Sequence, residues 1–94
     1  MSEQPLEVRD NRERSRFELV AGDEVVGFAD YRVEGDRVVF PHTVIDPSRR
    51  GQGLGAILVR AALDEVRKTG RSVVPTCRYV AEFMDRHPEY AALR

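Results

Sequence analysis

The sequence contains one cysteine, no tryptophan and no long hydrophobic run, and each absence narrows what the chain can be. The single cysteine, Cys77, excludes an internal disulfide and fits a reducing compartment. No apolar stretch approaches the roughly 20 residues that a membrane-spanning helix needs. Residues 1–5 have neither the basic nor the apolar region of a secretory signal. We therefore expect a soluble, cytoplasmic protein that does not act at a membrane.

An excess of charge of one sign is also absent. The chain has 15 basic and 16 acidic residues, so its formal net charge is −1. This balance provides no basic surface for nucleic acid, and we expect no nucleic-acid partner. Its 94 residues, 41% of them apolar, correspond to one small domain over residues 1–94 with a modest core.

The first half of the chain has the alternation of apolar and polar residues that is typical of β-strands. The predicted strands are residues 6–10, 16–21, 24–34 and 37–45. Gly22-Asp23 and Gly35-Asp36 separate the last three of them, as in two-residue hairpin turns. Alternation places Val25 on the same strand face as Ala29. Pro41 predicts a bulge or an edge position, because proline cannot donate a ladder hydrogen bond. This half is therefore predicted to be an antiparallel meander of three or four strands.

The second half changes to a helical period. Leu54 to Val66 carries apolar residues at helical spacing, and Gly70 is typical of a helix end. Residues 72–75 form a brief strand, reached by a crossover long enough for parallel pairing with the preceding strand. Residues 79–86 predict a second helix, and Pro88 opens a last turn. The predicted fold is α+β (α/β), with one mixed sheet of about five strands and short C-terminal helices.

Charged side chains of the long helix are predicted to form a solvated face. Arg60 with Asp64, and Asp64 with Lys68, have the i,i+4 spacing of helix-stabilising ion pairs. Arg67 is placed on the same solvated face. His87, beside a proline, is predicted to order the final turn. The predicted core of the second helix is Val80, Phe83 and Met84.

Three alternating glycines join the last strand of the meander to the long helix. The first N–H groups of a helix have no intrahelical partner and lie at the positive end of its dipole. Because glycine has no side chain, a phosphate can approach these groups closely and accept several hydrogen bonds. The predicted phosphate-binding residues are Arg50, Gly51, Gln52, Gly53, Leu54, Gly55 and Ala56.

Two common phosphate-binding motifs do not fit this turn. A P-loop ends in Gly-Lys-Ser/Thr, which is missing here. Gly51, Gly53 and Ala56 do satisfy the dinucleotide pattern G-x-G-x-x-A. That fold requires an acidic residue roughly 20 residues on, where this chain has Pro75-Thr76-Cys77. Too little chain remains for two nucleotide-binding halves, so this reading is excluded as well.

The third motif is the acyl-CoA pyrophosphate turn, R/Q-x-x-G-x-G/A, which Arg50, Gly53 and Gly55 match in order. The chain here resembles the GNAT superfamily of N-acetyltransferases, and more closely their small stand-alone YidJ-like members. The resemblance extends over most of the chain from residue 38 onward. Its further blocks are His42-Thr43-Val44, Asp46-Pro47, Pro75-Thr76-Cys77 and Arg86-His87-Pro88-Glu89-Tyr90. The alternative is that the three glycines only build a tight strand-to-helix turn.

The resemblance implies acetyl-CoA as co-substrate and direct transfer of its acetyl group to a primary amine, on a small molecule or a protein. In the family, the pantetheine arm lies between the fourth and fifth strands. Backbone groups around Val44 and Ile45 would pair with its amides like an added strand. The amides of residues 50–56 would hold the pyrophosphate, with Arg49 and Arg50 adding charge.

His42, Cys77 and Tyr79 are the candidate catalytic residues. Alternation places His42 on the strand face of Phe40, near the expected thioester, and a histidine pKa near 6.5 suits a general base. A strand histidine satisfied by a carbonyl is the equal alternative. Cys77 is a candidate general acid or transient acetyl carrier, or else a small buried hydrophobe. Tyr79 is an alternative acid, because many relatives use a tyrosine on the helix after the fifth strand. The sequence has no metal-ligand spacing.

The acceptor side is the part that the resemblance does not define. Larger family members insert two helices between the first and second strands, whereas residues 11–15 leave only a short connection here. We expect an acceptor side that is open, or completed by another chain, in a monomer or a homodimer. The alternative function is a non-catalytic acyl-CoA-binding or protein-interaction domain that kept the cofactor turn.

Overall fold

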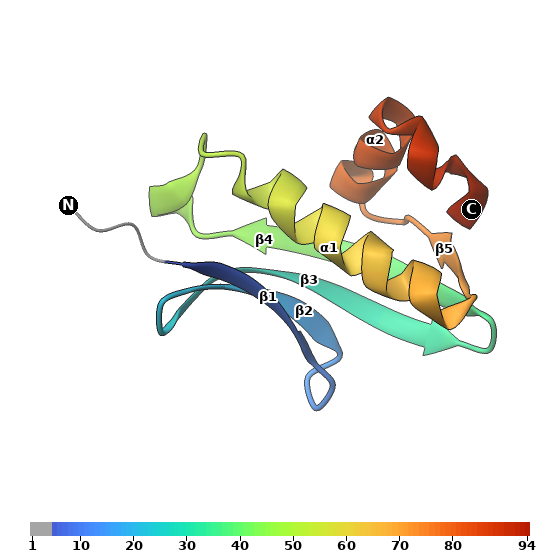
Figure 1. The fold of residues 1–94 in the computed structure, drawn as a ribbon, viewed down its shortest axis with the longest axis horizontal. Coiled ribbons are helices and arrows are strands. Elements are labelled where there is room, and N and C mark those ends of the chain that lie inside the picture. The colour runs from blue at the N-terminus through green and yellow to red at the C-terminus, as the bar shows by residue number, and fades with distance from the viewer. Residues whose placement is uncertain (1–4) are drawn as a thin grey trace.

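Five strands form a single mixed sheet in the computed structural model, which describes residues 5–94 (Figure 1). They lie in chain order, with β1 to β4 antiparallel and β5 parallel to β4. The strands are β1 Leu6–Asn11, β2 Arg16–Ala21, β3 Glu24–Glu34, β4 Arg37–Ile45 and β5 Ser72–Val74. The helices are α1 Leu54–Thr69 and α2 Arg78–Arg86, with short 3₁₀ segments η1 Pro47–Arg49 and η2 Pro88–Leu93. The meander, the crossover helix and the parallel fifth strand confirm the predicted fold.

Both Gly-Asp pairs form two-residue hairpin turns, as predicted. Ala21 pairs with Glu24 across the first turn, and residues 34 and 37 pair across the second. The φ angles of Gly22 and Gly35 are 62° and 64°, in the left-handed region that glycine enters without strain. A left-handed first central residue is the requirement of the type II′ turn, whose twist matches that of the flanking strands.

A bulge in β3 corrects the predicted face of one side chain. Leu19 of β2 pairs with Gly27, whereas the next residue, Val20, pairs with Val25, so Val26 is an extra residue in β3. Val26 is therefore turned into the core, and Val25 is exposed rather than sharing the face of Ala29. The prediction for Val25 was wrong because a bulge shifts the alternation by one residue.

A second bulge lies in β4, at the position where Pro41 predicts one. Asp30 pairs with His42 and Arg32 pairs with Val39, so β4 contains one more residue than β3 between these two pairs. Before the bulge, Phe40 faces the core; after it, residue 43 takes the core-facing position opposite the fully buried Ala29. The bulge prediction is confirmed, and its effect on His42 is described with the site.

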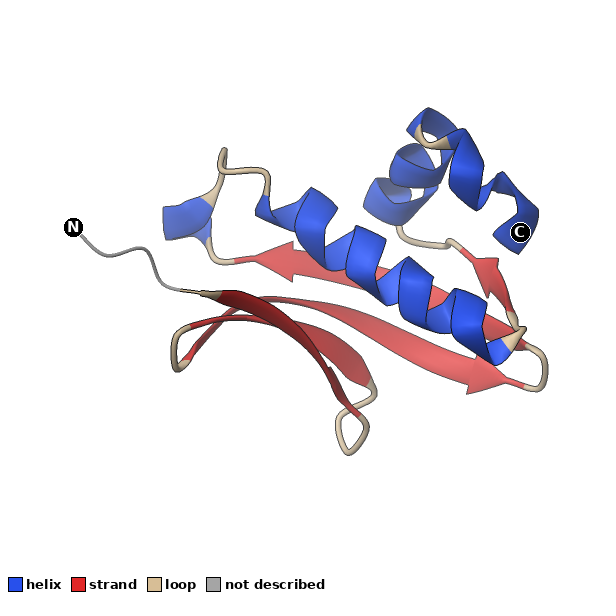
Figure 2. Ribbon diagram, in the orientation of Figure 1, coloured by secondary structure: helices blue, strands red, loops and turns tan. Residues whose placement is uncertain are grey.

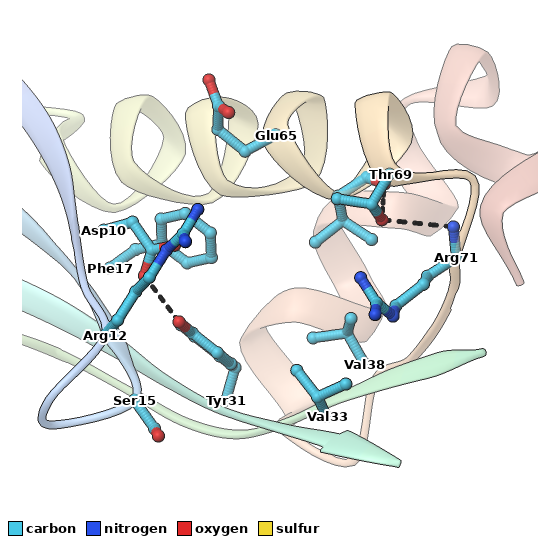
Figure 3. Close-up of a pocket in the computed structure, with 11 residues that line it drawn as sticks. Asp10, Arg12, Ser15, Phe17, Tyr31, Val33, Val38, Glu65, Thr69 and Arg71 are labelled. Carbon is cyan, nitrogen blue, oxygen red and sulfur yellow. Dashed lines mark hydrogen bonds and ion pairs between the residues drawn. The ribbon is translucent and has the colours of Figure 1, made fainter. Parts of the chain in front are cut away.

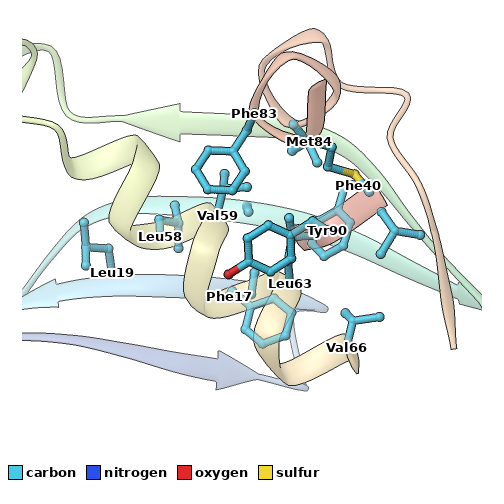
Figure 4. Packing of buried hydrophobic residues seen from close by; sticks show 14 of the residues in the cluster. Phe17, Leu19, Phe40, Leu58, Val59, Leu63, Val66, Phe83, Met84 and Tyr90 are labelled. Carbon is cyan, nitrogen blue, oxygen red and sulfur yellow. The ribbon is translucent and has the colours of Figure 1, made fainter. Parts of the chain in front are cut away.

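Helix α1 covers one face of the sheet and supplies much of the core (Figure 2). Leu58 and Leu63 are fully buried against strand residues such as Leu19 and Phe40 (Figure 4). Burying each such side chain contributes roughly 1.5–3 kcal/mol. The predicted core residues of α2, Val80, Phe83 and Met84, are also buried.

The C-terminal η2 segment is fastened to α1 by a buried tyrosine. The Tyr90 hydroxyl donates to Asp64 at 2.8 Å, and Arg67 donates to the Glu89 carbonyl at 2.7 Å. Arg60 lies 3.3 Å from the Glu89 carboxylate. Arg60 and Arg67 are exposed, as predicted, whereas Asp64 is half-buried, and neither predicted i,i+4 pair forms. The sequence period could not reveal that another segment contacts Asp64.

Two smaller predictions concern the end of the chain and the membrane. His87 Nδ1 is 2.7 Å from the Phe83 carbonyl, and the two rings stack with centroids 4.0 Å apart, so His87 does order the final turn. Over residues 5–94, no helix combines the length and the apolar character needed to cross a membrane.

Candidate functional site

The glycine turn between β4 and α1 has backbone angles that only glycine adopts easily. Asp46 begins η1 by accepting from the Ser48 amide at 3.0 Å, which holds its pKa below the usual range. The chain then turns through Gly51 and Gly53, with φ of 83° and 74°. Gly53 is the N-cap of α1, and no side chain caps this helix end. The sequence thus ends the strand, turns, and starts a helix whose first amides stay uncovered.

Six successive amides at this turn have no acceptor within the described residues. They belong to residues 51–56, and the next amide, that of Ile57, makes the first helical hydrogen bond, to Gly53 O at 3.4 Å. No atom lies within 4 Å of the position of an added Cβ at Gly51 or Gly53. Uncovered amides at the positive end of a helix dipole, with open space before them, suit an anion.

A shallow pocket of about 190 Å³ lies over this turn. Its walls include Ile45 of β4, Arg50 and Tyr79 of α2. Arg50 is exposed, whereas the neighbouring Arg49 is paired with Glu24 at 3.0 Å. The structure therefore brings the predicted Ile45, Arg50, Gly51, Gly53, Leu54 and Gly55 together around one hollow.

Tyr79 packs directly on the first turn of α1, a contact that sequence reasoning missed. A Cβ added to Gly55 would lie 2.6 Å from the Tyr79 hydroxyl oxygen, so any larger residue there must displace the ring. Burial raises the pKa of Tyr79 above its usual value, and the charge of Arg86 opposes this effect only in part. The raised pKa favours the protonated phenol. The only sign of this contact in the sequence was Gly55, the third glycine, because a tight turn by itself does not need a third glycine.

Strands β4 and β5 separate after a short pairing, which leaves one edge of β4 open. Their register runs from Arg37–Ser72 to Val39–Val74 and stops there. Beyond it, Phe40 O accepts from the Cys77 amide at 2.7 Å and from the Thr76 hydroxyl at 3.2 Å. In the described part of the chain, no strand pairs with residues 41–45 on the β5 side. The predicted Val44 and Ile45 lie on this open edge, where an extended ligand can add as a strand.

Cys77 lies at the point where the two strands separate, on the core side of the sheet. It is the N-cap residue of α2 and half-buried, and its thiol lies 3.6 Å from the Thr43 hydroxyl across the gap. The predicted position after the fifth strand is confirmed.

His42 lies at the same separation but on the opposite face of the sheet. The β4 bulge places residues 38, 40, 43 and 45 toward the core, so His42 and Val44 face outward. The prediction that His42 shares the Phe40 face is therefore wrong. His42 is exposed, and its Nε2 is 3.9 Å from an Asp30 carboxylate oxygen. The structure thus puts an imidazole–carboxylate pair on one side of the gap and a thiol on the other.

No metal centre is formed by this arrangement. Among residues 5–94, no three His, Cys, Asp or Glu side chains gather as metal ligands. The gap between β4 and β5 therefore brings together His42 and Cys77, whereas Tyr79 lies at the glycine turn.

The chain belongs to the GCN5-related N-acetyltransferase family, an enzyme class defined by this sheet and turn. Residues 16–93 match the family described as GCN5-related N-acetyl-transferase. Protein NATD1 from Bos taurus is 30% identical over 86 residues, which cover 89% of this chain and 76% of that protein. Protein NATD1 from Gallus gallus is 29% identical over 86 residues and is covered to 78%.

Two solved structures share the fold. The ribosomal-protein-S18-alanine N-acetyltransferase from Escherichia coli has a TM-score of 0.62 at 28% identity, covering 70% of this chain. The match takes in 44% of that enzyme, so this chain spans less than half of its length. A GCN5-like protein from Staphylococcus aureus has a TM-score of 0.70 at 20% identity, with 99% and 89% of the two chains covered. At that identity the likeness shows the fold alone, and the YidJ-like grouping stays a resemblance.

Proposed function

We propose that the protein uses acetyl-CoA to acetylate a primary amine on a small molecule or a protein. The observation that carries this proposal is the continuity of two binding features. The uncovered amides of residues 51–56 lead directly, through Ile45, to the open edge of β4. One feature suits a diphosphate and the other suits an extended arm with amides, and acetyl-CoA contains both.

The cofactor would be held chiefly by backbone. The amides of residues 51–56 and the Arg50 guanidinium would bind the pyrophosphate, and the edge around Val44 and Ile45 would bind the pantetheine arm. Tyr79 lies against Gly55 at the turn, so its ring would form one side of the cofactor site. When bound, acetyl-CoA supplies an activated acyl group as a thioester.

The side chains at the gap would manage the protons. A primary ammonium has a pKa near 10.4, so it must lose a proton before its nitrogen can attack. The His42 imidazole would accept that proton on the outer face through Nδ1, because its Nε2 faces the Asp30 carboxylate at 3.9 Å. As the thioester C–S bond is replaced by the new C–N bond, the Cys77 thiol would donate a proton to the departing thiolate. Tyr79, on α2, is the alternative proton donor, and burial raises the pKa of its phenol.

Cofactor binding is tested by substituting glutamate for each of two glycines in matched surroundings. Gly53 and Gly70 flank α1 with φ of 74° and 76°, and both face open space. Gly53→Glu and Gly70→Glu therefore carry the same strain and charge, but only the first opposes a pyrophosphate. At a hundredfold excess over Kd, acetyl-CoA stabilises a protein by about 2.7 kcal/mol, which raises Tm by about 10 °C or more for this size. We expect this shift in the wild type and in Gly70→Glu, and none in Gly53→Glu.

Catalysis is tested by acetyl transfer to a panel of amines, followed by mass spectrometry. We expect His42→Ala and Cys77→Ala to lower kcat by roughly 10²-fold or more each, with unchanged acetyl-CoA affinity. A stable mass increase of one acetyl group on Cys77 would favour the carrier role over the acid role. A thermal shift without transfer to any amine would favour the non-catalytic acyl-CoA-binding domain. No thermal shift at saturating acetyl-CoA would contradict both functions.

A further inference from the structure

A second and larger pocket lies at the other end of α1. It has a volume of about 410 Å³, within the usual range for small-molecule sites. Its floor consists of the buried apolar side chains Phe17, Val38 and Val66, and the exposed Val33 lies at its rim. The β1–β2 hairpin forms another wall (Figure 3). Along the helix, this pocket is about 16–22 Å from the glycine turn, given a rise of 1.5 Å per residue. It is therefore separate from the proposed cofactor site.

One wall of the pocket is aromatic. The Phe17 and Tyr31 rings lie 5.1 Å apart at 43°, and both approach the buried Phe40. The Tyr31 hydroxyl donates to Asp10 at 2.6 Å, so that carboxylate is occupied. Offset and tilted rings of this kind pack well against a further planar ring.

The two carboxylates that line the pocket are paired within the protein. The second oxygen of Asp10 accepts from Arg12, and the Glu65 carboxylate is paired with Lys68 at 3.1 Å. Arg71 differs, because its guanidinium has no carboxylate partner within residues 5–94.

Arg71 is held so that its charge points into the pocket. Its Nε donates to the Gly35 carbonyl at 3.1 Å, and its backbone amide donates to the Thr69 hydroxyl at 3.2 Å. Figure 3 shows the guanidinium between the helix end and the apolar floor at Val38. The two terminal nitrogens remain available for an anion, and a guanidinium fork binds a carboxylate with two parallel hydrogen bonds.

We propose that this pocket binds a small aromatic carboxylate, whose ring packs on Phe17 and Tyr31 and whose carboxylate pairs with Arg71. The apolar floor excludes a purely polar anion such as phosphate as the preferred ligand. The arginine gives a preference for an acid over the neutral alcohol of the same shape, because the alcohol leaves the charge unpaired. This site is independent of acetyl transfer and of acetyl-CoA.

The test is a titration of the ¹⁵N-labelled protein with 2-naphthoate, followed by amide chemical shifts. A ligand of this size is expected to bind with a Kd of about 0.01–1 mM. We expect saturable shifts at residues 31–38 and 65–71. We expect 2-naphthylmethanol, the neutral counterpart, to bind at least tenfold more weakly.

Two arginine variants distinguish the site from general anion binding. Arg71→Gln removes the proposed anchor, whereas Arg37→Gln removes a nearby exposed arginine that does not line the pocket. We expect 2-naphthoate affinity to fall at least tenfold in Arg71→Gln and to stay unchanged in Arg37→Gln. A third variant, Val33→Phe, fills the pocket from its exposed rim and should abolish the shifts without a charge change. Equal affinity in wild type and Arg71→Gln, or no saturable shifts in the wild type, would overturn the proposal.

Discussion

The Tyr31 phenol is half-buried and donates a hydrogen bond to the Asp10 carboxylate. Burial raises its pKa to about 12, helped by the hydrogen bond to Asp10 and by the charge of that carboxylate. The pKa in the folded protein is above the usual value near 10, so the protonated phenol stabilises the fold. That contribution is complete below about pH 10 and is lost as the pH rises through about 12.

We therefore expect the phenolate absorbance of Tyr31 to appear only near pH 12. Tyr31→Phe should remove this component from the ultraviolet titration. The same variant should also weaken the fall in the urea midpoint between about pH 10 and 12. Tyr79→Phe is the comparison, because it removes a different phenol with no partner carboxylate. If Tyr31 ionises at about pH 10, like an exposed tyrosine, its bond to Asp10 is absent in solution.

Single residues also show how far the sequence determines the site. Arg50, Gly51 and Gly53 could be located because a missing side chain and a positive φ are local properties. The face of His42 could not, because one extra residue at the β4 bulge turns every later side chain over. The contact between Tyr79 and Gly55 depends on how α2 docks on α1, which no local pattern reports.

At the scale of elements, a part-buried hydrogen bond is one of the contacts that hold the η2 segment against α1. Tyr90 is 2% exposed, and its hydroxyl donates a hydrogen bond to Asp64 of α1. Tyr90→Phe leaves that carboxylate without its partner, and Asp64→Ala leaves the phenol without its acceptor. Each change is expected to lower the free energy of unfolding by about 1–2 kcal/mol.

A double-mutant cycle measures this link directly by urea denaturation. The coupling between Tyr90→Phe and Asp64→Ala is expected to be about 0.5–2 kcal/mol. Glu65→Ala with Tyr90→Phe is the control, because Glu65 is on the same helix but pairs with Lys68. Additive effects of Tyr90 and Asp64 would show that η2 is not held by this bond.

The elements themselves were largely predictable, and the reason is local. Alternation, the two Gly-Asp turns and the helical period of residues 54–66 act within a few residues of each other. The predicted i,i+4 pairs of Asp64 do not form, because Asp64 accepts a hydrogen bond from Tyr90, 26 positions away. Contacts over that separation depend on the path of the whole chain.

For the whole molecule, the sheet divides the two sides of the proposed reaction. The glycine turn, Cys77 and α1 lie on the core side, whereas His42 and Asp30 lie on the outer face. The outer face is covered locally by side chains, such as Arg16 stacked on Phe28 at 4.4 Å. In the proposed reaction, a donor bound from one side and an amine from the other would meet at the gap between β4 and β5. This division follows from the order of five strands and one bulge.

Such a small domain should be sensitive to a single core deletion in α1. A domain of this size has a stability of roughly 5–10 kcal/mol, and Leu63 is completely buried. Leu63→Ala is expected to cost about 3–5 kcal/mol, since it removes buried methyl groups and leaves a cavity. Tm, followed by circular dichroism, should fall by more than about 10 °C.

Ile57→Ala is the matched control on the same helix. Ile57 is 42% exposed, so its truncation should cost less than about 1 kcal/mol. If the two variants lose similar stability, α1 does not dock through the face that carries Leu63. Saturating acetyl-CoA should also raise the Tm of both variants, because a ligand that binds only the folded protein stabilises any variant that keeps the site.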